Sequence, residues 1–533
     1  MNIDKNMLID VPTDEGVHIK KAGKKGEKYV YKYIEYFRNA NGEPRNKAKS
    51  IGKYDIDTGK MHPNENYFKM YNINPIMPDV MVWDYGYSYL VLQACTDSGL
   101  MDCLKHAFGK KAMDIIVMAA YIIREGGAMD GIDDWLGRNY FPNYRRLLTS
   151  QSTSKLFSSL TPEQEHKFFV RWVKITMSDA GACYDVSSIS SHAKEMTTVE
   201  FGYNRDREKL AQFNLGLFCD ELNKLPLYYN RYNGSLTDKT NLSYVLDNAK
   251  AVGIKRVKMI VDGGFWDKDC FRSLNKHCAA FTVGMPAHFK ESQALLDEHA
   301  GNVGKYANEL NEPHMYCVPI ETEIFGVKGK ALLYFDSWNH VQQCQELSER
   351  INRYKAELQK LKRYPKSKLR KYEPYFIITK HEEGSGFDFE VDFDKVEKAR
   401  KSKGYFLIFS TDDVATPDDV LGHYRAKDIA EKMFAQIKCE MEGNRIRTHN
   451  EKTTDGKTFV TFIACVIRTY MLNTLKQYLR DNSTSLKKVF NQLSNITIIS
   501  TGDNPRFTKA LSKKQREILQ VFGADKNILS SLK

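Results

Sequence analysis

The stretch GACYDVSSIS, residues 181–190, marks the point where the character of this chain changes. Residues 86–178 before it carry apolar residues at helical spacing, which predicts a bundle of helices. The stretch itself is strand-like and contains one acid, Asp185, after a tyrosine and before two serines. The type of sheet that the chain forms therefore depends on how the later strands pair with this one.

The segments that follow alternate between strand-like and helix-like patterns. We predict strands at 181–190, 212–220, 225–232, 256–264 and 279–286, and helices at 240–252 and 267–276. Three successive strands followed by helical crossovers predict a mixed sheet, antiparallel at first and parallel later. We therefore expect an α/β protein whose first and fourth strands are neighbours.

Residues 287–420 interrupt this pattern with strand candidates at 330–338, 373–380 and 403–411. A helix between the first two has apolar residues in a 4-3-4-3 spacing, at Leu347, Ile351, Tyr354, Leu358 and Leu361. Residues 345–372 carry ten Lys/Arg and three Glu. This segment is either a basic helical arm or a packed helix. Further helices are predicted at 457–479 and 512–523.

The composition favours a globular protein with an anionic partner. A chain of 533 residues is expected to form two to four domains of about 100–200 residues each. Hydrophobic residues make up 42% and charged residues 27%, which excludes a disordered chain. The formal net charge of +12 favours nucleic acid as the partner.

Cysteine usage and hydropathy predict a cytoplasmic protein. The ten cysteines form no CxxC pair and no zinc-ligand spacing, which is typical of inert thiols in a reducing compartment. Residues 1–16 lack the basic-then-apolar order of a signal peptide. No run of about eighteen apolar residues predicts a membrane span. The sequence also lacks a P-loop and an HExxH motif.

The N-terminal region is basic and predicts a β-hairpin. Residues 20–53 hold eleven Lys/Arg and three Glu, and they alternate apolar and polar residues around an Asn-Gly turn. Such a hairpin could lie on a DNA backbone, with Lys20, Lys21, Lys24 and Lys25 as contacts, or it could be a small solvated sheet.

Three acids stand where chemistry is expected. Asp185 lies in the first strand, Asp262 ends the fourth strand before two glycines, and Glu431 lies on a late helix. Acids at strand ends of an α/β sheet lie where ligand crevices form, and their oxygens suit Mg²⁺ or Mn²⁺. Alternatively, Asp185 caps a turn, Asp262 ends a strand before a glycine turn, and Glu431 belongs to a solvated helix face.

The late helix is HYRAKDIAEKMFAQIKCEMEGNRIRTH, residues 423–449. Four polar side chains on it are spaced by 3, 4 and 7 residues, namely Tyr424, Lys427, Glu431 and Lys438. On a continuous α-helix they fall within roughly 60° of one another. They therefore predict one polar stripe, beside an apolar face that packs on the protein.

The segments YDVSSIS, GYNRD, LPLYYNRYNGS, VDGGFW and FTVGMP, followed by this helix, resemble a DDE transposase of the insertion-sequence-four superfamily. That group carries Tyr, two residues, Arg, three residues, Glu, six residues and Lys on its last catalytic helix. The chain matches at Tyr424, Glu431 and Lys438 and departs at Lys427, which keeps the charge but not the planar fork of arginine. The resemblance covers about residues 180–450.

The resemblance implies an RNase H-like five-stranded mixed sheet with flanking helices, interrupted by a β-rich insertion. It implies that Asp185, Asp262 and Glu431 bind two Mg²⁺ or Mn²⁺ ions. DNA contacts are expected from the stripe residues Tyr424, Lys427 and Lys438, and further candidates are Arg205 and Arg425, the latter on a different face. In relatives with a DNA hairpin intermediate, a tryptophan stacks on a flipped base. Trp338 and Trp266 are the candidates, and burial in the core is the alternative for both.

The expected domains are a basic N-terminal β-hairpin region (1–80), a helical domain (81–178), two parts of an RNase H-like core (179–286 and 421–455), the insertion with its helical arm (287–420) and a C-terminal helical region (456–533). The expected function is that of a bacterial insertion-sequence transposase. It would act as a homodimer on double-stranded DNA, both terminal inverted repeats and target, in the nucleoid. A nuclease of the same fold that cuts without joining and a non-catalytic DNA-binding protein are the alternatives.

Overall fold

The computed structural model describes residues 7–22, 27–73, 81–193, 196–255, 257–383, 385–500 and 505–532. The chain divides into two compact units. The first unit comprises Met1–Ile175, Ile189–Val199 and Ala435–Lys533, and the second comprises Thr176–Ser188 and Glu200–Phe434. The first unit thus combines the N-terminal segments with the C-terminal helices, while the second contains most of the predicted sheet and insertion.

An antiparallel sheet begins the first unit. Its strands, in spatial order, are β1 (Val17–Lys21), β2 (Lys28–Arg38), β3 (Pro44–Tyr54) and β4 (Met61–Pro63), and α1 (Glu65–Tyr71) follows. Val30, Ile51 and Met61 form its small core. Strands β2 and β3 pair across a turn in which Gly42 takes a positive φ of 78°, so the predicted hairpin is confirmed.

Helices form most of the remaining first unit. They are α2 (Gly86–Asp97), α3 (Leu100–Phe108), α4 (Ala112–Glu125), α5 (Ile132–Arg138), α6 (Ser150–Ser158), α7 (Pro162–Thr176), α16 (Glu451–Asp481), α17 (Leu486–Ser494) and α18 (Lys513–Val521). Strands β17 (Arg506–Phe507), β16 (Thr497–Ser500) and β5 (Met81–Asp84) add a small sheet.

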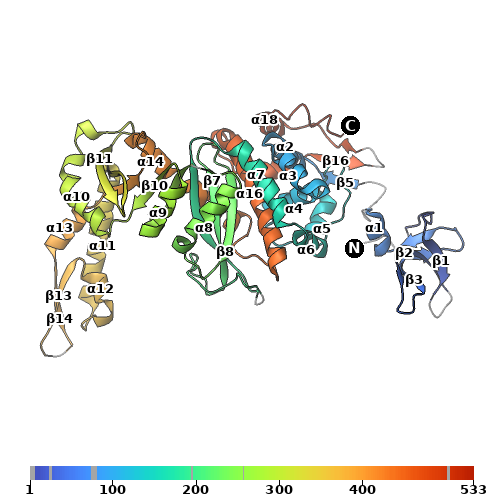
Figure 1. Cartoon of the computed structure of the whole chain (residues 1–533), viewed down its shortest axis with the longest axis horizontal. Coiled ribbons are helices and arrows are strands. Elements are labelled where there is room, and N and C mark those ends of the chain that lie inside the picture. The colour runs from blue at the N-terminus through green and yellow to red at the C-terminus, as the bar shows by residue number, and fades with distance from the viewer. Residues whose placement is uncertain are drawn as a thin grey trace. The chain divides into compact units, whose positions relative to one another are not determined.

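Helix α16 is the centre of this bundle and packs along α4 and α6 (Figure 1). By length and composition it is the one described helix that could cross a membrane, but 72% of its most apolar window is buried inside the protein. Gly456 allows its close approach to α6, because a Cβ there would clash with the backbone of Phe157. The helix is therefore accounted for as the core of a bundle.

A mixed sheet dominates the second unit. Its spatial order is β11-β12-β15-β10-β9-β6-β7-β8. The bounds are β6 (Ala182–Ser190), β7 (Gln212–Asp220), β8 (Pro226–Asn233), β9 (Lys258–Val261), β10 (Ala280–Met285), β11 (Met315–Ile324), β12 (Val327–Asp336) and β15 (Tyr405–Ser410). Strands β7 and β8 pair antiparallel, while β9 pairs parallel with both β6 and β10. The mixed sheet and the contact of the first and fourth strands are confirmed.

The sheet is larger than the five strands that we expected, because within the described residues it has eight. Strand β15 of the insertion pairs antiparallel with β10, with Thr282 opposite Ser410, and β12 and β11 follow. Without them β10 would be an edge with unpaired backbone groups. The insertion therefore continues the sheet.

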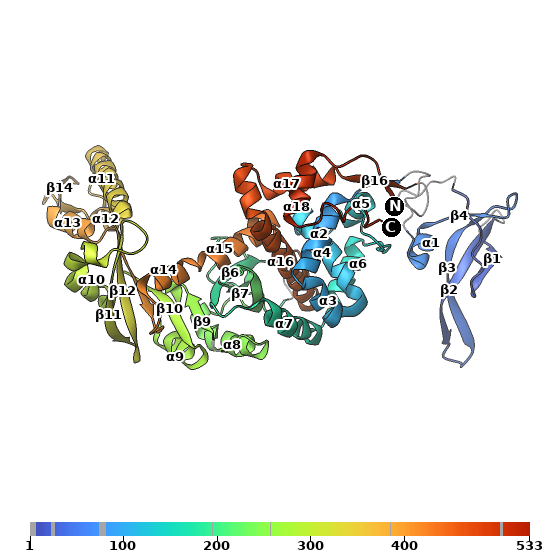
Figure 2. The same ribbon diagram turned by 90° about the horizontal axis from the view of Figure 1, so that it is seen from above.

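Helices cover both faces of this sheet. Figure 2 shows α14 (Pro417–Arg425) and α15 (Asp428–Ala435) on one side, and α8 (Asp238–Ala251) and α9 (Lys268–His277) on the other. The insertion adds α10 (Lys290–Val303), α11 (Ser337–Lys360), α12 (Leu369–Tyr372), α13 (Phe393–Lys401) and the hairpin β13 (Phe376–Lys380)–β14 (Phe387–Val391).

The predicted continuous helix at 423–449 is wrong. Helix α14 ends at Arg425, α15 begins at Asp428, and a π-helical turn follows at Gln436–Glu440. Between the helices the amide of Lys427 donates to the carbonyl of Tyr424, at 3.2 Å, instead of making an i to i−4 bond. The polar stripe therefore includes a tightened turn at Lys427.

Candidate active site

Asp185 and Asp262 occupy matching positions on neighbouring parallel strands. The register pairs Cys183 with Ile260 and Tyr184 with Val261, so the next residues along the two strands are these two acids. Residues at matching positions of a parallel pair project from the same face of the sheet. Asp262 directly follows β9 and precedes the turn Gly263–Phe265, so the Asp185 carboxylate within β6 and the Asp262 carboxylate at the end of β9 stand side by side.

The junction between α14 and α15 lies over this same face. The thiol of Cys183 donates to the carbonyl oxygen of Ala426, at 3.2 Å. Because Cys183 and Asp185 are two residues apart on one strand, both face the helices. On β7 the sulfur of Cys219 lies 3.1 Å from that of Met433, which places α15 over the neighbouring strand. The sheet and the helix thus bring Glu431 to the side occupied by the two aspartates.

Tyr424 packs closely against the sheet at a position where the strand has a glycine. A Cβ added at Gly284 in β10 would clash with the hydroxyl of Tyr424 and lie 2.9 Å from its Cζ atom. The tyrosine also packs against the cluster that contains Tyr334, Ile408 and Leu421. We did not single out Gly284 in the sequence, although a glycine inside a strand often marks a close approach of another group.

Lys427 links the second and third acids. Its ammonium nitrogen lies 3.0 Å from a carboxylate oxygen of Glu431, 3.8 Å from one of Asp262 and 5.6 Å from the ring centre of Tyr424. Burial acts to lower the pKa of Lys427, but the hydrogen bond to Glu431 and the neighbouring negative charges outweigh it and raise the pKa. Lys427 is therefore a firmly charged cation between two acids.

Asp185 is the most buried of the three acids. The pKa of Asp185 is raised to about 6, chiefly by burial and also by the charges of Asp262 and Glu431, while a backbone hydrogen bond and Arg205 act to lower it. The three carboxylates therefore lie within electrostatic reach of one another. Bringing a cation among them would favour their ionised forms.

Arg205 supports the strand that carries Asp185. One guanidinium nitrogen donates to the carbonyl of Val186, and the other lies 2.5 Å from Asp238. Tyr232 donates to the second oxygen of Asp238, at 2.6 Å. These contacts give Arg205 a positioning role beside Asp185, while its predicted contact with DNA stays a prediction.

The donor chemistry of this cluster fits a hard divalent cation. Carboxylate oxygens are the ligands that Mg²⁺ and Mn²⁺ prefer. Within the described ranges, however, no three His, Cys, Asp or Glu side chains are close enough together to hold a metal ion. The ammonium of Lys427 lies between Asp262 and Glu431 and balances their charge. A metal held by all three acids would therefore require Lys427 to move aside.

The two tryptophan candidates have opposite environments. Trp266 is 2% exposed and is surrounded by the rings of Phe271, Phe289 and Phe325, so the alternative of burial in the core is confirmed for it. Trp338 is 69% exposed and stacks on His314 at a ring distance of 4.2 Å, so burial in the core is wrong for this residue.

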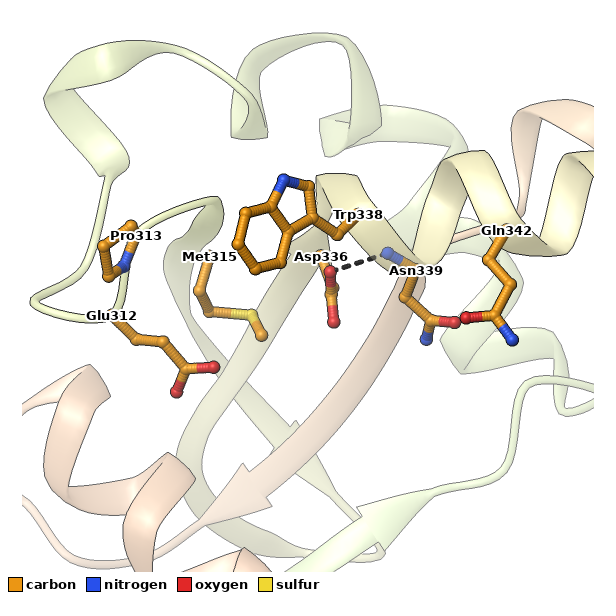
Figure 3. A pocket seen from close by; sticks show the side chains of 7 residues that line it. All are labelled: Glu312, Pro313, Met315, Asp336, Trp338, Asn339 and Gln342. Atoms are coloured by element: carbon orange, nitrogen blue, oxygen red, sulfur yellow. Dashed lines mark hydrogen bonds between the residues drawn. The ribbon is translucent and has the colours of Figure 1, made fainter.

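Trp338 is one of the residues that line a pocket of about 430 Å³ (Figure 3). The other lining residues are Glu312, Pro313, Met315, Asp336, Asn339 and Gln342. Arg425 pairs with Glu312 through both guanidinium nitrogens, one of them at 3.1 Å. Arg425 therefore pairs with a residue that lines this pocket, and its predicted contact with DNA stays a prediction.

The remaining DNA-binding candidates lie in the first unit or outside the described residues. Lys20 and Lys21 are exposed on the edge strand β1. Lys24 and Lys25 lie outside the residues that the structure describes. Lys438 lies in the π-helical turn.

Comparison with known proteins points to one family. The family model described as "Transposase DDE domain" matches residues 178–467, more than half of the chain. A cryo-EM structure of a piggyBac transposase synaptic complex with hairpin DNA is similar with a TM-score of 0.33 and 11% identity, over 83% of this chain and 75% of that chain. No curated protein matches the chain. The assignment of a family rests on the family model alone.

Proposed function

The chain belongs to the transposase DDE domain family, and on that premise we propose that it is the transposase of a bacterial insertion sequence. It binds the terminal inverted repeats of its element as a homodimer, cuts the DNA there and joins the ends to target DNA. It works in the bacterial cytoplasm, at the nucleoid. Membership in the insertion-sequence-four superfamily is part of this proposal.

The observation that carries the proposal is the matching position of Asp185 and Asp262, with Glu431 linked to Asp262 through Lys427. Strand order supports an RNase H-like core made of β6 to β10, because β6 lies between β7 and β9 with β8 and β10 outside them. The basic net charge of +12 fits a DNA substrate.

Asp185, Asp262 and Glu431 would hold the two Mg²⁺ or Mn²⁺ ions. When bound, such ions activate the attacking oxygen and stabilise the leaving oxygen of a phosphodiester. The protein itself supplies orientation and charge. Tyr424, Lys427 and Lys438 contact phosphates near the scissile bond, and Arg205 holds the strand of Asp185 in place. At neutral pH, Asp185 with a pKa of about 6 is mostly ionised and ready to bind a cation.

Trp338 adds a stacking surface for an extruded base in this proposal. Its exposed indole and the adjoining pocket support that role. An aromatic ring stacks on any base, because every base has a π-face.

The test of the active site uses the isosteric variants Asp185→Asn, Asp262→Asn and Glu431→Gln. Each should abolish Mg²⁺-dependent cleavage of DNA that carries the ends of the element. The matched controls are Asp297→Asn and Glu291→Gln, two exposed acids of α10 that should cleave normally. A triad variant with near-normal cleavage would show that this position is misassigned. Cleavage without strand joining by the unaltered protein would support a nuclease instead.

A further inference from the structure

The insertion contains an arm, residues 345–392, that folds around its own core. Leu358 of α11, Tyr372 of α12 and Phe376 of β13 form this core. Partly buried side chains close it from both sides, namely Ile351, Tyr354, Leu361, Tyr375, Ile378, Phe387, Phe389 and Val391. Figure 1 shows α12 beside the hairpin β13–β14. The apolar seam of α11 therefore packs within the arm, and both of our sequence interpretations hold in part.

Charge is divided unequally between the two halves of the arm. Residues 345–372 carry ten Lys/Arg and three Glu, whereas residues 373–392 carry six Asp/Glu and one Lys. The densest part is 360–371, where seven cations occur without an acid, at Lys360, Lys362, Arg363, Lys366, Lys368, Arg370 and Lys371. The helical half is thus strongly basic and the hairpin half acidic.

The cations of 360–371 are mostly without counter-ions. All seven are exposed. In the part of the chain that the structure describes, Lys371 pairs with Glu357, and none of the other six forms an ion pair. Like charges that are close in the chain repel one another, and no ion pair among the described residues offsets this repulsion for the six. A regularly charged anionic partner would remove that repulsion, and duplex DNA carries one charge for about every 1.7 Å of its axis.

We propose that the basic segment 360–371 binds the phosphate backbone of duplex DNA, as a contact separate from the active site. The acidic hairpin β13–β14 directs the DNA to the helical half of the arm, because phosphates are repelled from its carboxylates. The inference rests on the proposed function and deepens it, since it names a second surface for the same substrate. The contact is to the backbone and therefore independent of base sequence.

The test reverses three exposed charges in the full-length protein, with Lys362→Glu, Lys366→Glu and Lys368→Glu combined. The matched control combines Lys250→Glu, Lys255→Glu and Lys276→Glu, which change the net charge equally. These control lysines are exposed on α8, before β9 and on α9. Asp262 follows the opposite end of β9, so the control lies away from the active site.

Affinity for a labelled DNA duplex is measured over a series of salt concentrations. Each lost phosphate contact lowers the slope of log K against log salt by about 0.9, so the arm variant should lose up to about 2.7 and bind at least tenfold more weakly at low salt. The control should keep the slope of the unaltered protein. An arm variant with the same slope and affinity as the control would overturn the proposal. Loss of binding to duplex RNA but not to duplex DNA would overturn it too.

Two further measurements separate misfolding and failure of the proposed function from failure of the arm. The neutral triple variant Lys362→Gln, Lys366→Gln and Lys368→Gln should fold normally and show a smaller slope than the unaltered protein, and an unchanged slope in it counts against the arm. Mg²⁺-dependent cleavage is assayed in parallel. If the unaltered protein binds DNA through the arm but never cleaves, the proposed function fails while the arm contact stands. If it cleaves and the arm variant binds like the control, the arm proposal alone fails.

Discussion

The ammonium group of Lys427 lies 3.0 Å from the carboxylate of Glu431, one helical turn further along the chain. The same nitrogen is 3.8 Å from Asp262. A single lysine thus lies between two of the three acids that would hold a divalent cation. The lysine side chain is a compact point charge that can move away on a flexible stem.

We expect Lys427→Met to strengthen Mn²⁺ binding and weaken binding to DNA ends. Removal of a positive charge at this distance leaves the carboxylates free for the metal, which should tighten Mn²⁺ binding about tenfold. Calorimetric titration with Mn²⁺ measures this without any need for activity. Lys432→Met, at an exposed position on α15, is the control and should leave Mn²⁺ affinity unchanged. Weaker Mn²⁺ binding by the Lys427 variant would contradict the assignment of Asp262 and Glu431 as metal ligands with which Lys427 competes.

Gly284→Ala should destabilise the second unit by about 1–3 kcal/mol, because the added Cβ clashes with Tyr424. The cost should be smaller in a Tyr424→Ala background, which removes the clashing ring. Gly422→Ala in α14 is the comparison, since its Cβ would meet nothing within 4 Å. That change should stabilise the helix by about 1 kcal/mol. Denaturant unfolding of the four variants measures these differences, and equal costs in both backgrounds would disprove the contact.

Substitutions of the two tryptophans should have different effects, one on the stability of the protein and the other on its binding to DNA. Trp266→Ala is expected to cost about 3–5 kcal/mol of unfolding free energy, since it empties a ring-lined core site. Trp338→Ala should leave stability nearly unchanged and weaken binding of an extruded base by about 1–3 kcal/mol. Thermal unfolding and binding of DNA with a flipped or abasic end nucleotide test both. A large loss of stability in the Trp338 variant would place that ring in the core.

His423 should make stability depend on pH near neutrality. Its ring nitrogen lies 2.5 Å from Glu221, and this hydrogen bond raises the pKa of His423 above its usual 6.5 against the opposing effect of burial. Because the folded pKa is the higher one, the stabilisation is complete below pH 6.5 and is lost as the pH rises through the folded pKa.

The measurement compares unfolding free energies of the unaltered protein and His423→Gln from about pH 5 to about pH 9. The difference between them should shrink as the pH rises. Glu221→Gln should remove the same pH dependence. A difference that grows with pH would show that His423 is held neutral.

Local patterns predicted much of the fold. The alternation of strand and helix residues predicted the mixed sheet and the neighbouring first and fourth strands, and with them the adjacency of Asp185 and Asp262. The Asn-Gly turn predicted the hairpin of β2 and β3. These features follow from side-chain period and turn chemistry, which neighbouring residues determine.

The tertiary structure decided the features that depend on distant residues. The pairing of β15 with β10 extended the sheet, and packing on the sheet accompanies the break between α14 and α15 at Lys427. The residues next to each tryptophan in the sequence do not predict whether it is buried. Surrounding rings enclose Trp266, while Trp338 lies against His314 and is exposed to solvent. The sequence by itself determined which acidic and basic side chains are available for the candidate active site. Only the tertiary structure decided that Lys427 lies between two of those acids, since that contact joins a strand end to a helix from a distant part of the chain.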